Sequence, residues 1–544
     1  MAYPGWDIDL GWLVWIGFVP LLIAIHNQTK NTATKYRYGF FNKKIFLTGF
    51  LAGFIYFLIV FRWLWSLYPL TTLGVESNLI SFLIVGAVWL ITSAGVALPW
   101  GVGSTVLSSF FSLKFKIKNL KLLNLLFIPA IFTLSEYLRS FFFGLTWYGS
   151  GTLIGPHWTM GSPAYSLANN SLALKLSSFT GIYGVVFLII FVNVLIWHFW
   201  GKNLQKLKNL NLKTRKVFIS IIILAVLTLG PALLNWLTAK KAPTMTPRQI
   251  NYAIIQTNFP TKLFYEASEL LNHFNNQLSL LKQISKKYPE TDLILFPEGS
   301  GLFKNLSIFQ TTEQNEEFFN NLFDKPTLII DSSITTNQFG GQISRVISID
   351  SKLGAKGYYD KKLLSPGGEF MPYSIKLFAW LFALKDVSFF IESRDLTHGA
   401  KDVSTVNFNN RFKSATIVCS ELFSPGLLRL TAQDSDIITV LTSNSIFRGS
   451  ETLIGQNLAI AKFRAAENQK PLLLSANGGL SYAINSFGNV NNIARNQDQK
   501  LLTGSMAISN PESWYNKQGD NPILLGSLVL ASTGILRFRL KRKN

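Results

Sequence analysis

The chain has 544 residues, of which 48% are hydrophobic and only 15% are charged, and its mean hydropathy is +0.26. Soluble domains carry about a quarter charged residues, so this composition favours a membrane protein. The net charge of +22 could indicate nucleic-acid binding, but the basic residues lie in short runs between long apolar stretches, as in membrane proteins. A single cysteine excludes an internal disulfide and a thiolate-rich metal site.

Apolar segments dominate the first half of the chain, and a bilayer span takes about 20 residues. We expect spans at 10–26, 46–66, 79–112, 122–145, 178–199, 217–236 and 521–537. The third is too long for one straight helix, so we expect a break or kink at Pro99 and Gly101. The opening MAYPGWDIDLGW has no basic segment and no cleavage site, so we do not expect it to be a cleavable signal peptide.

The charges of the connecting segments alternate along the chain. The basic segments are 27–45, 113–121, 200–216 and 537–543. By contrast, 67–78 has no Lys or Arg, and 146–177 has only Lys175. Because basic loops favour the cytoplasm, the segment 240–515 is expected on the outer side of the membrane. This topology also places the N-terminus outside, which an additional span preceding this sequence would explain.

Two features of the apolar half stand out. Glu136 and Arg139 lie within a span, three residues apart and so on one helix face. Intramembrane charges tend to pair structurally or to line a functional cavity, and the sequence leaves both open. The stretch 144–158, rich in Gly, Trp and Tyr, is typical of a loop at the headgroup level.

From about residue 249 short β-rich runs alternate with helical ones, which indicates a layered α/β fold. We expect strands at 252–256, 292–296, 327–331, 345–349, 415–418, 436–441 and 471–475. We expect helices at 264–287, 314–323 and 450–468.

Three candidate catalytic residues follow or lie near strand ends, where α/β folds present groups to ligands. Glu298 follows LILFP, Lys361 lies in YYDKKLLSPGGEF, and Cys419 follows ATIV. Each also has an ordinary structural explanation. A cysteine after an apolar strand can be a small buried hydrophobe, the carboxylate can stabilise a helix N-terminus, and the lysine can lie in a solvated loop.

Other catalytic motifs are absent from the sequence. It has no phosphate-binding G-x-x-x-x-G-K-[ST] loop, no H-E-x-x-H, no C-x-x-C and no G-x-S-x-G elbow. The five histidines are scattered along the chain. We therefore expect neither a metal nor a nucleotide cofactor.

Taken together, Glu298, Lys361 and Cys419 resemble, in order and spacing, the Glu-Lys-Cys triad of the nitrilase superfamily. The segment around Lys361 is similar to the pattern Y-x-K-x-x-L-x-P-x-G-E of bacterial apolipoprotein N-acyltransferases. The matching residues are Tyr359, Lys361, Leu364, Pro366, Gly368 and Glu369. Segments 253–262, 443–444, 464–468 and 477–481 resemble the same family.

The apolar half also resembles this family. EYLR at 136–139 followed by GLTW at 144–147 is similar to its E-x-L-R…G-F-P-W stretch, and GIYG at 181–184 resembles its next span. AYPGWD at 2–7 resembles the loop after the family's first span. The likeness thus covers nearly the whole chain.

Three departures from the family pattern surround the triad. Ser420 stands where the family has Tyr, and Gly367 stands where it has an aromatic residue. Its Asn-Asp-x-Trp-Phe segment is replaced here by NSIF at 444–447. The triad is complete, whereas its rim is altered.

The resemblance implies a polytopic α-helical membrane domain at 1–240 and an extracytoplasmic, nitrilase-like αββα sandwich domain at 241–515. A final transmembrane helix with a basic cytoplasmic tail would occupy 516–544. It also places the protein in the bacterial inner membrane. The apolar stretch 370–390 is either a lid or lipid-entry arm at the membrane interface or an ordinary buried helix.

The implied reaction moves the sn-1 acyl chain of a phospholipid, typically phosphatidylethanolamine, to Cys419 as a thioester. The α-amine of a diacylglyceryl-cysteine apolipoprotein then takes the acyl chain. Glu298 would be the general base and Lys361 the oxyanion stabiliser. The supporting residues would be Glu369, Glu421 and Asn444. We expect a monomer that binds no nucleic acid.

Three other functions remain open from the residues. A membrane-tethered carbon–nitrogen hydrolase would use the same triad with water as acceptor. A catalytically inactive scaffold in lipoprotein processing would fit the altered rim. A lipid or peptide transporter would predict broken polar helices in internal repeats, and the sequence has no internal repeat.

Overall fold

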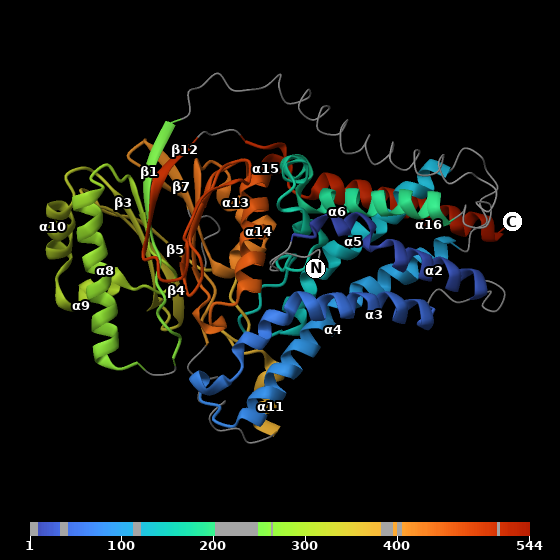
Figure 1. The fold of residues 1–544 in the computed structure, drawn as a ribbon, viewed down its shortest axis with the longest axis horizontal. Helices are drawn as coiled ribbons and strands as arrows, with labels where there is room; N and C mark the ends of the chain where they lie inside the picture. The colour runs from blue at the N-terminus through green and yellow to red at the C-terminus, as the bar shows by residue number, and fades with distance from the viewer. Residues whose placement is uncertain are drawn as a thin grey trace.

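The computed structural model describes residues 9–32, 42–111, 121–201, 248–262, 265–381, 395–399, 405–508 and 512–543. Figure 1 shows a bundle of long helices on one side, which we call the membrane half, and a layered α/β unit on the other, which we call the sandwich domain. The membrane half contains η1 (Gly11–Leu13), α1 (Val14–Gly17), α2 (Val19–Thr32), α3 (Lys43–Val60), η2 (Phe61–Leu67), η3 (Leu70–Leu73), α4 (Asn78–Phe111), α5 (Lys121–Thr146), η5 (Pro163–Leu167), α6 (Ser171–Gly201) and α16 (Asn521–Lys543).

Five described helical stretches are long and apolar enough to cross a membrane: Gly11–Lys30, Lys43–Leu67, Asn78–Ser108, Leu125–Thr146 and Ser171–His198. They match the first five predicted spans. The span predicted at 217–236 lies outside the described residues. In α16 the apolar stretch is Asn521–Thr533, which is shorter than a full span.

Of the break or kink expected at Pro99 and Gly101, a break is excluded, because α4 continues through both residues as one helix. Small residues let α3 approach α4 closely there, as is usual between membrane helices. A Cβ on Gly49 would collide with Ser104, and one on Gly101 would meet the ring of Phe46. The described break lies in α6 instead, at Gly181, whose φ of +62° is left-handed.

The charged pair inside the apolar half is buried and structural in its contacts. Arg139 Nε lies 2.9 Å from Glu136 Oε2, and the two side chains are 1% and 2% exposed. The other Glu136 oxygen accepts a hydrogen bond from Trp100 Nε1 at 2.5 Å. Arg139 also donates to the carbonyls of Met160 at 2.7 Å and Thr159 at 3.3 Å. The pair therefore ties helix α5 to the loop that precedes α6.

The stretch 144–158 packs within the protein more than its composition predicts. Trp147 and Trp158 are 6% and 4% exposed, and Trp147 donates to Thr92 Oγ1 at 3.0 Å. Tyr148 is 47% exposed. Both tryptophans of this loop are thus buried inside the protein, whereas Leu145, Tyr148 and Ile154 remain at the surface.

The sandwich domain consists of two six-stranded sheets with helices outside each. The strands are β1 (Arg248–Ile255), β2 (Leu293–Leu295), β3 (Leu328–Thr336), β4 (Gln342–Asp350), β5 (Gly354–Asp360), β6 (Thr405–Phe408), β7 (Phe412–Val418), β8 (Ile437–Ser443), β9 (Leu472–Asn477), β10 (Tyr482–Ile484), β11 (Val490–Ile493) and β12 (Leu501–Ile508). The helices are α8 (Ala267–Lys287), α9 (Leu302–Phe309), α10 (Thr312–Leu322), α11 (Tyr373–Leu381), η7 (Cys419–Phe423), α13 (Pro425–Ala432), η8 (Ser445–Phe447), α14 (Glu451–Asn468) and α15 (Trp514–Gln518).

The strand order is β12-β1-β2-β3-β4-β5 in one sheet and β11-β10-β9-β8-β7-β6 in the other. Alternation along a strand sends neighbouring side chains to opposite faces. Accordingly, Ile254 of β1 packs between the two sheets, whereas Ala253 and Ile255 pack under α8 and α9. The predicted αββα sandwich is confirmed, and the seven predicted strands are all present.

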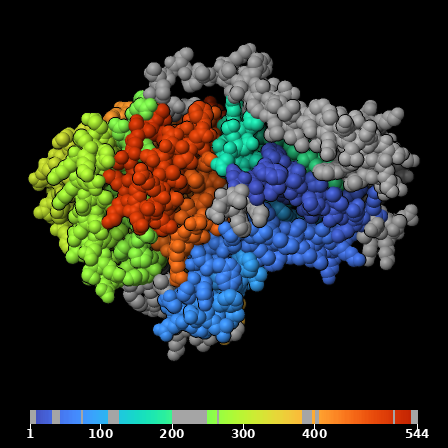
Figure 2. Space-filling view, in the orientation of Figure 1, coloured from blue at the N-terminus to red at the C-terminus, as the bar shows by residue number. Residues whose placement is uncertain are grey.

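Helices α13 and α14 lie between the second sheet and the membrane half (Figure 1). One apolar core spans this boundary and joins Ile417 and Val440 of the sheet with Ile460 of α14 and Ile182 of α6. The space-filling view shows the two halves in broad contact (Figure 2). The sandwich domain is therefore fixed on the membrane helices by a shared hydrophobic core.

The ion pair of Arg139 generates a stability prediction. Replacing Arg139 with Leu leaves Glu136 buried without its cation, which should cost about 3–5 kcal/mol. We expect a lower thermal unfolding midpoint in detergent. Lys44→Leu, at the exposed start of α3, is the control and should change little. An unchanged midpoint for Arg139→Leu would contradict a structural role.

Candidate active site

Strand ends from both sheets meet at one end of the sandwich. Strands β2 and β3 are parallel, and β5 returns to their direction after the antiparallel β4. Glu298 follows β2 and Lys361 follows β5 in the first sheet, and Cys419 follows β7 in the second. The fold therefore brings together the three predicted residues, which lie far apart in sequence.

The three side chains form one connected group with Glu369. Lys361 Nζ lies 2.9 Å from Glu298 Oε1 and 2.9 Å from Glu369 Oε2. The Cys419 thiol is close enough to Glu298 for that carboxylate to raise the pKa of the thiol, and Thr442 Oγ1 donates to the sulfur at 3.5 Å. The remaining oxygen of Glu298 accepts the Ser443 N–H at 3.0 Å. These contacts fix the carboxylate between the cation and the thiol.

Charge and burial set the protonation of this group. Burial raises the pKa of Glu298 above its usual value, against the opposing effect of Lys361. Burial alone would lower the pKa of Lys361, but the two carboxylates hold it well above its ordinary range. Burial and the charge of Glu298 raise the pKa of the Cys419 thiol to about 12. The resting site is a neutral thiol beside a carboxylate and a permanent cation, which suits general-base activation of the thiol.

The backbone at Cys419 is strained, with φ of +46°, a conformation that few non-glycine residues adopt. It lies where β7 ends and the 3₁₀ turn η7 begins. This sharp turn carries the sulfur out of the sheet toward the other two residues. Strained backbone at a reactive residue persists only where the surrounding contacts hold it.

Glu421 is a structural tie in this arrangement. One of its oxygens accepts the Tyr359 hydroxyl at 2.6 Å and the Lys362 N–H at 2.8 Å. The other accepts the Val418 N–H at 2.8 Å. The side chain is 1% exposed, so it joins the lysine strand to the cysteine strand and has no opening toward an incoming amine.

Asn444 lies at the rim and contributes through its backbone. Its N–H donates to the Asn477 carbonyl at 2.7 Å. Beside it, the hydroxyls of Thr261 and Ser445 are 2.6 Å apart, and the Asn477 amide donates to Ser443 Oγ at 3.1 Å. This polar rim joins the ends of β1, β8 and β9 next to the thiol.

Two of the departures from the family pattern have local explanations. Ser420 Oγ donates to the Leu363 carbonyl, so a hydroxyl ties η7 to the lysine loop where an aromatic residue is expected. Gly367 adopts φ of +78°, which glycine reaches without strain.

Helix α11 exposes large apolar side chains at the surface of the protein. Its exposed side chains are Tyr373, Leu377, Phe378, Trp380 and Leu381. Of the two alternatives for 370–390, an ordinary buried helix is therefore wrong for α11, whereas Phe370 and Met371 just before it are buried; 382–390 lies outside the described residues. The N–H of Tyr373 donates to the Tyr148 carbonyl at 2.9 Å, so α11 begins against the membrane half.

Sequence reasoning missed two groups that orient the triad, the Thr442 hydroxyl and the Ser443 N–H. Both act on residues distant in sequence, and a backbone N–H leaves no mark in composition. Within the described ranges, no group of three His, Cys, Asp or Glu is placed to hold a metal ion.

The family model described as "Apolipoprotein N-acyltransferase N-terminal domain" matches residues 1–195. An apolipoprotein N-acyltransferase from Rickettsia typhi is 26% identical over 81% of this chain and 79% of its own length. One from Geobacter metallireducens is 23% identical over 98% of this chain and 92% of its own length.

Among solved structures, the carbon–nitrogen hydrolase from Helicobacter pylori G27 is 14% identical, with a TM-score of 0.37, over 51% of this chain and 95% of that one. The nitrilase-superfamily protein Nit3 from Saccharomyces cerevisiae is 13% identical, with a TM-score of 0.36, over 49% of this chain and 93% of that one.

The contacts of Glu421 predict that stability and activity are both sensitive to its replacement. In Glu421→Gln an acceptor oxygen becomes an amide donor, which leaves a buried N–H or hydroxyl without a partner, at about 1–3 kcal/mol for each lost bond. We expect a lower unfolding midpoint and loss of activity. Tyr359→Phe removes one bond and should be milder.

The control for this pair is Glu512→Gln, a carboxylate 40% exposed that pairs with Lys517. It should leave the midpoint and the activity unchanged. Glu421→Gln behaving like Glu512→Gln would rule out the tie between the two strands.

Proposed function

We propose that the chain, which is similar to apolipoprotein N-acyltransferases over most of its length, transfers an acyl chain from a membrane phospholipid, through a Cys419 thioester, to the N-terminal amine of a diacylglyceryl apolipoprotein. This reaction would be the last step of lipoprotein maturation. The observation that supports it most is the buried group of Glu298, Lys361 and Cys419 in a domain that shares its core with membrane helices.

In the first half-reaction the thiol proton goes to Glu298 as the sulfur attacks the ester carbonyl of the phospholipid. The charge that develops on the carbonyl oxygen is stabilised by the Lys361 ammonium, an effect worth several kcal/mol at comparable sites. The ester C–O bond then breaks, and the proton passes from Glu298 to the leaving lysophospholipid. The product is an acyl thioester on Cys419, and Glu298 is again ionised.

In the second half-reaction the free amine of the apolipoprotein attacks the thioester carbonyl. Such an α-amine has a pKa near 8, so part of it is neutral and nucleophilic at neutral pH. Glu298 accepts the proton that the amine loses, and the C–S bond breaks. The cysteine recovers a proton and an amide is formed, so the same carboxylate serves both steps.

The location follows from the substrates, which are both anchored in a bilayer. We place the enzyme in the bacterial inner membrane as a multi-pass protein, with the sandwich domain on the outer side, because the basic segments of the sequence favour the cytoplasm. Exposed apolar residues such as Trp380 and Leu377 on α11 would lie in the lipid interface and admit the acyl donor. No nucleic acid takes part, and a monomer suffices.

The first prediction of this proposal concerns the thioester. Incubation with phosphatidylethanolamine should add the mass of one acyl chain to the protein, and hydroxylamine should remove it. Cys419→Ala should show no gain. A lipopeptide with a free diacylglyceryl-cysteine amine should discharge the adduct.

Two results would contradict the proposal. A folded parent protein that gains no mass would exclude the phospholipid as donor under these conditions. An adduct that water discharges as fast as the lipopeptide does would favour a carbon–nitrogen hydrolase instead.

The second prediction concerns pH. The base must be ionised to accept the thiol proton, so acylation should slow as the pH falls through the pKa of Glu298, which burial raises above its ordinary value. Lys361 should give no alkaline limb, because its pKa lies well above the usual range. The rate of thioester formation in single turnovers, measured from acid to alkaline pH, tests both expectations.

Glu298→Gln should lower the acylation rate by about 100-fold or more, the usual contribution of a general base. The acid limb should disappear in this variant. Persistence of the limb would assign it to another group.

A further inference from the structure

The turn that carries the nucleophile is held at its far end by the membrane half. In η7 the carbonyls of Leu422 and Phe423 accept hydrogen bonds from residues outside the turn. Arg464 Nε donates to Leu422 O at 3.1 Å. Thr159 donates to Phe423 O twice, through Oγ1 at 2.5 Å and through its N–H at 3.3 Å. Thr159 comes from the loop between α5 and α6, 264 residues earlier in the chain.

The Thr159 hydroxyl is itself oriented by fixed neighbours. The Tyr165 hydroxyl lies 2.7 Å from it, and Arg464 Nη2 donates to it at 3.2 Å. A hydroxyl has one donor and two acceptor positions, and these contacts leave its proton for Phe423 O. Thr159 is fully buried.

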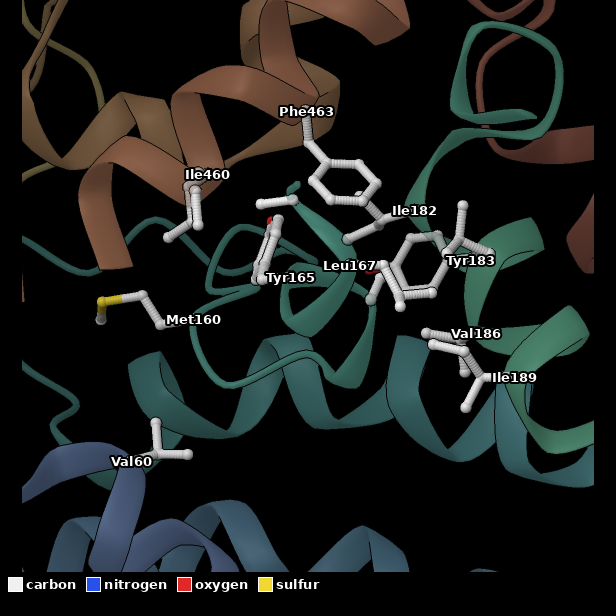
Figure 3. Close-up of a cluster of buried hydrophobic side chains, with 14 of the residues drawn as sticks. Val60, Met160, Tyr165, Leu167, Ile182, Tyr183, Val186, Ile189, Ile460 and Phe463 are labelled. Atoms are coloured by element: carbon white, nitrogen blue, oxygen red, sulfur yellow. The ribbon is translucent and has the colours of Figure 1, made fainter. Parts of the chain in front are cut away.

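The loop that carries Thr159 is rigid by its packing. The Thr159 carbonyl accepts a hydrogen bond from Arg139, which is paired with Glu136 in α5. Figure 3 shows Tyr165 in the apolar cluster that joins the loop to Phe463 and Ile460 of α14, and the Tyr165 and Phe463 rings are 5.5 Å apart. A chain of contacts therefore runs from a membrane span to the turn of Cys419.

We propose that Thr159 is a positioning residue for acyl transfer: through Phe423 O it holds η7, and with it the Cys419 sulfur, in register with Glu298. The proposal rests on the proposed role of Cys419 as nucleophile. The strained φ of Cys419 makes the turn dependent on such support, because relaxed backbone would swing the sulfur away. Sub-ångström alignment matters here, since a misplacement of about 1 Å can cost about 100-fold in rate.

The test compares Thr159→Val, which keeps the shape and removes the hydroxyl, with Thr159→Ser, which keeps the hydroxyl. We expect kcat to fall about tenfold or more in Thr159→Val, with KM for phosphatidylethanolamine unchanged because the residue does not contact the lipid. Thr159→Ser should restore most of kcat. Thr105→Val removes a buried hydroxyl whose bond to Gly101 O stays within α4, and it should behave like the parent.

A second readout does not depend on the acyl donor. Cys419 is the only thiol of the chain, so alkylation by iodoacetamide reports on this residue alone. The charged groups that face the sulfur are Glu298, Lys361 and Glu369. Loss of the Glu298 contact in Thr159→Val should change the pH dependence of alkylation, whereas a purely structural loss elsewhere would not.

The outcomes separate this proposal from the proposed function. If the parent forms no thioester but Thr159→Val changes the alkylation profile, the positioning role stands and the donor was wrong. If Thr159→Val folds with parental kcat and alkylation profile, the positioning role is overturned. Should Thr159→Val fail to fold, Tyr165→Phe, which removes one partner of the Thr159 hydroxyl and one acceptor of Arg464, must lower kcat several-fold at constant KM, and parental kcat would overturn the proposal.

Discussion

A lysine ammonium buried between two carboxylates is the interaction on which the candidate site depends. Lys361 is 1% exposed and lies 2.9 Å from both Glu298 and Glu369. Removing an ammonium from water costs several kcal/mol unless partners compensate, so the end of β5 can be buried only with both carboxylates in place. With one cation and two anions, the trio has a net charge of −1. Ionising Cys419 would add a second negative charge in a buried place, and burial together with the charge of Glu298 raises the pKa of the thiol to about 12.

This charge balance constrains the chemistry. We infer that the thiol proton moves to Glu298 while the carbon–sulfur bond forms, because a free thiolate beside the trio is unfavourable. The same net charge suits the second step, in which the attacking amine becomes positive.

The triad could be predicted from the sequence because its strands are visible there. Strands β2, β7 and β8 are buried on both faces and read as short apolar runs, and Glu298 and Cys419 follow the first two of these directly. Strands β6 and β11 were not predicted, since they are only four residues long and most of their side chains are partly exposed, so they show no apolar run.

The supporting contacts had even less local signal. Thr159 and Phe423 meet only because two halves of the chain share one core, and neither residue is unusual in its own segment. Glu421 was predicted as a supporting residue, but its tie between two strands depends on backbone N–H groups that composition does not record. These contacts are thus set by tertiary structure and could not be predicted from the local sequence pattern.

The hydrogen bonds that hold η7 also explain why the turn can lack the family's aromatic residue. Ser420 binds the Leu363 carbonyl, Arg464 binds that of Leu422, and Thr159 binds that of Phe423. The turn is therefore attached to the lysine loop, to α14 and to the membrane half, each through a hydrogen bond to a backbone carbonyl. Such bonds fix a backbone directly and need no bulky side chain at the turn. The replacement of an aromatic residue by Ser420 is consequently compatible with a complete triad, because the geometry of Cys419 is set by the carbonyls that follow it.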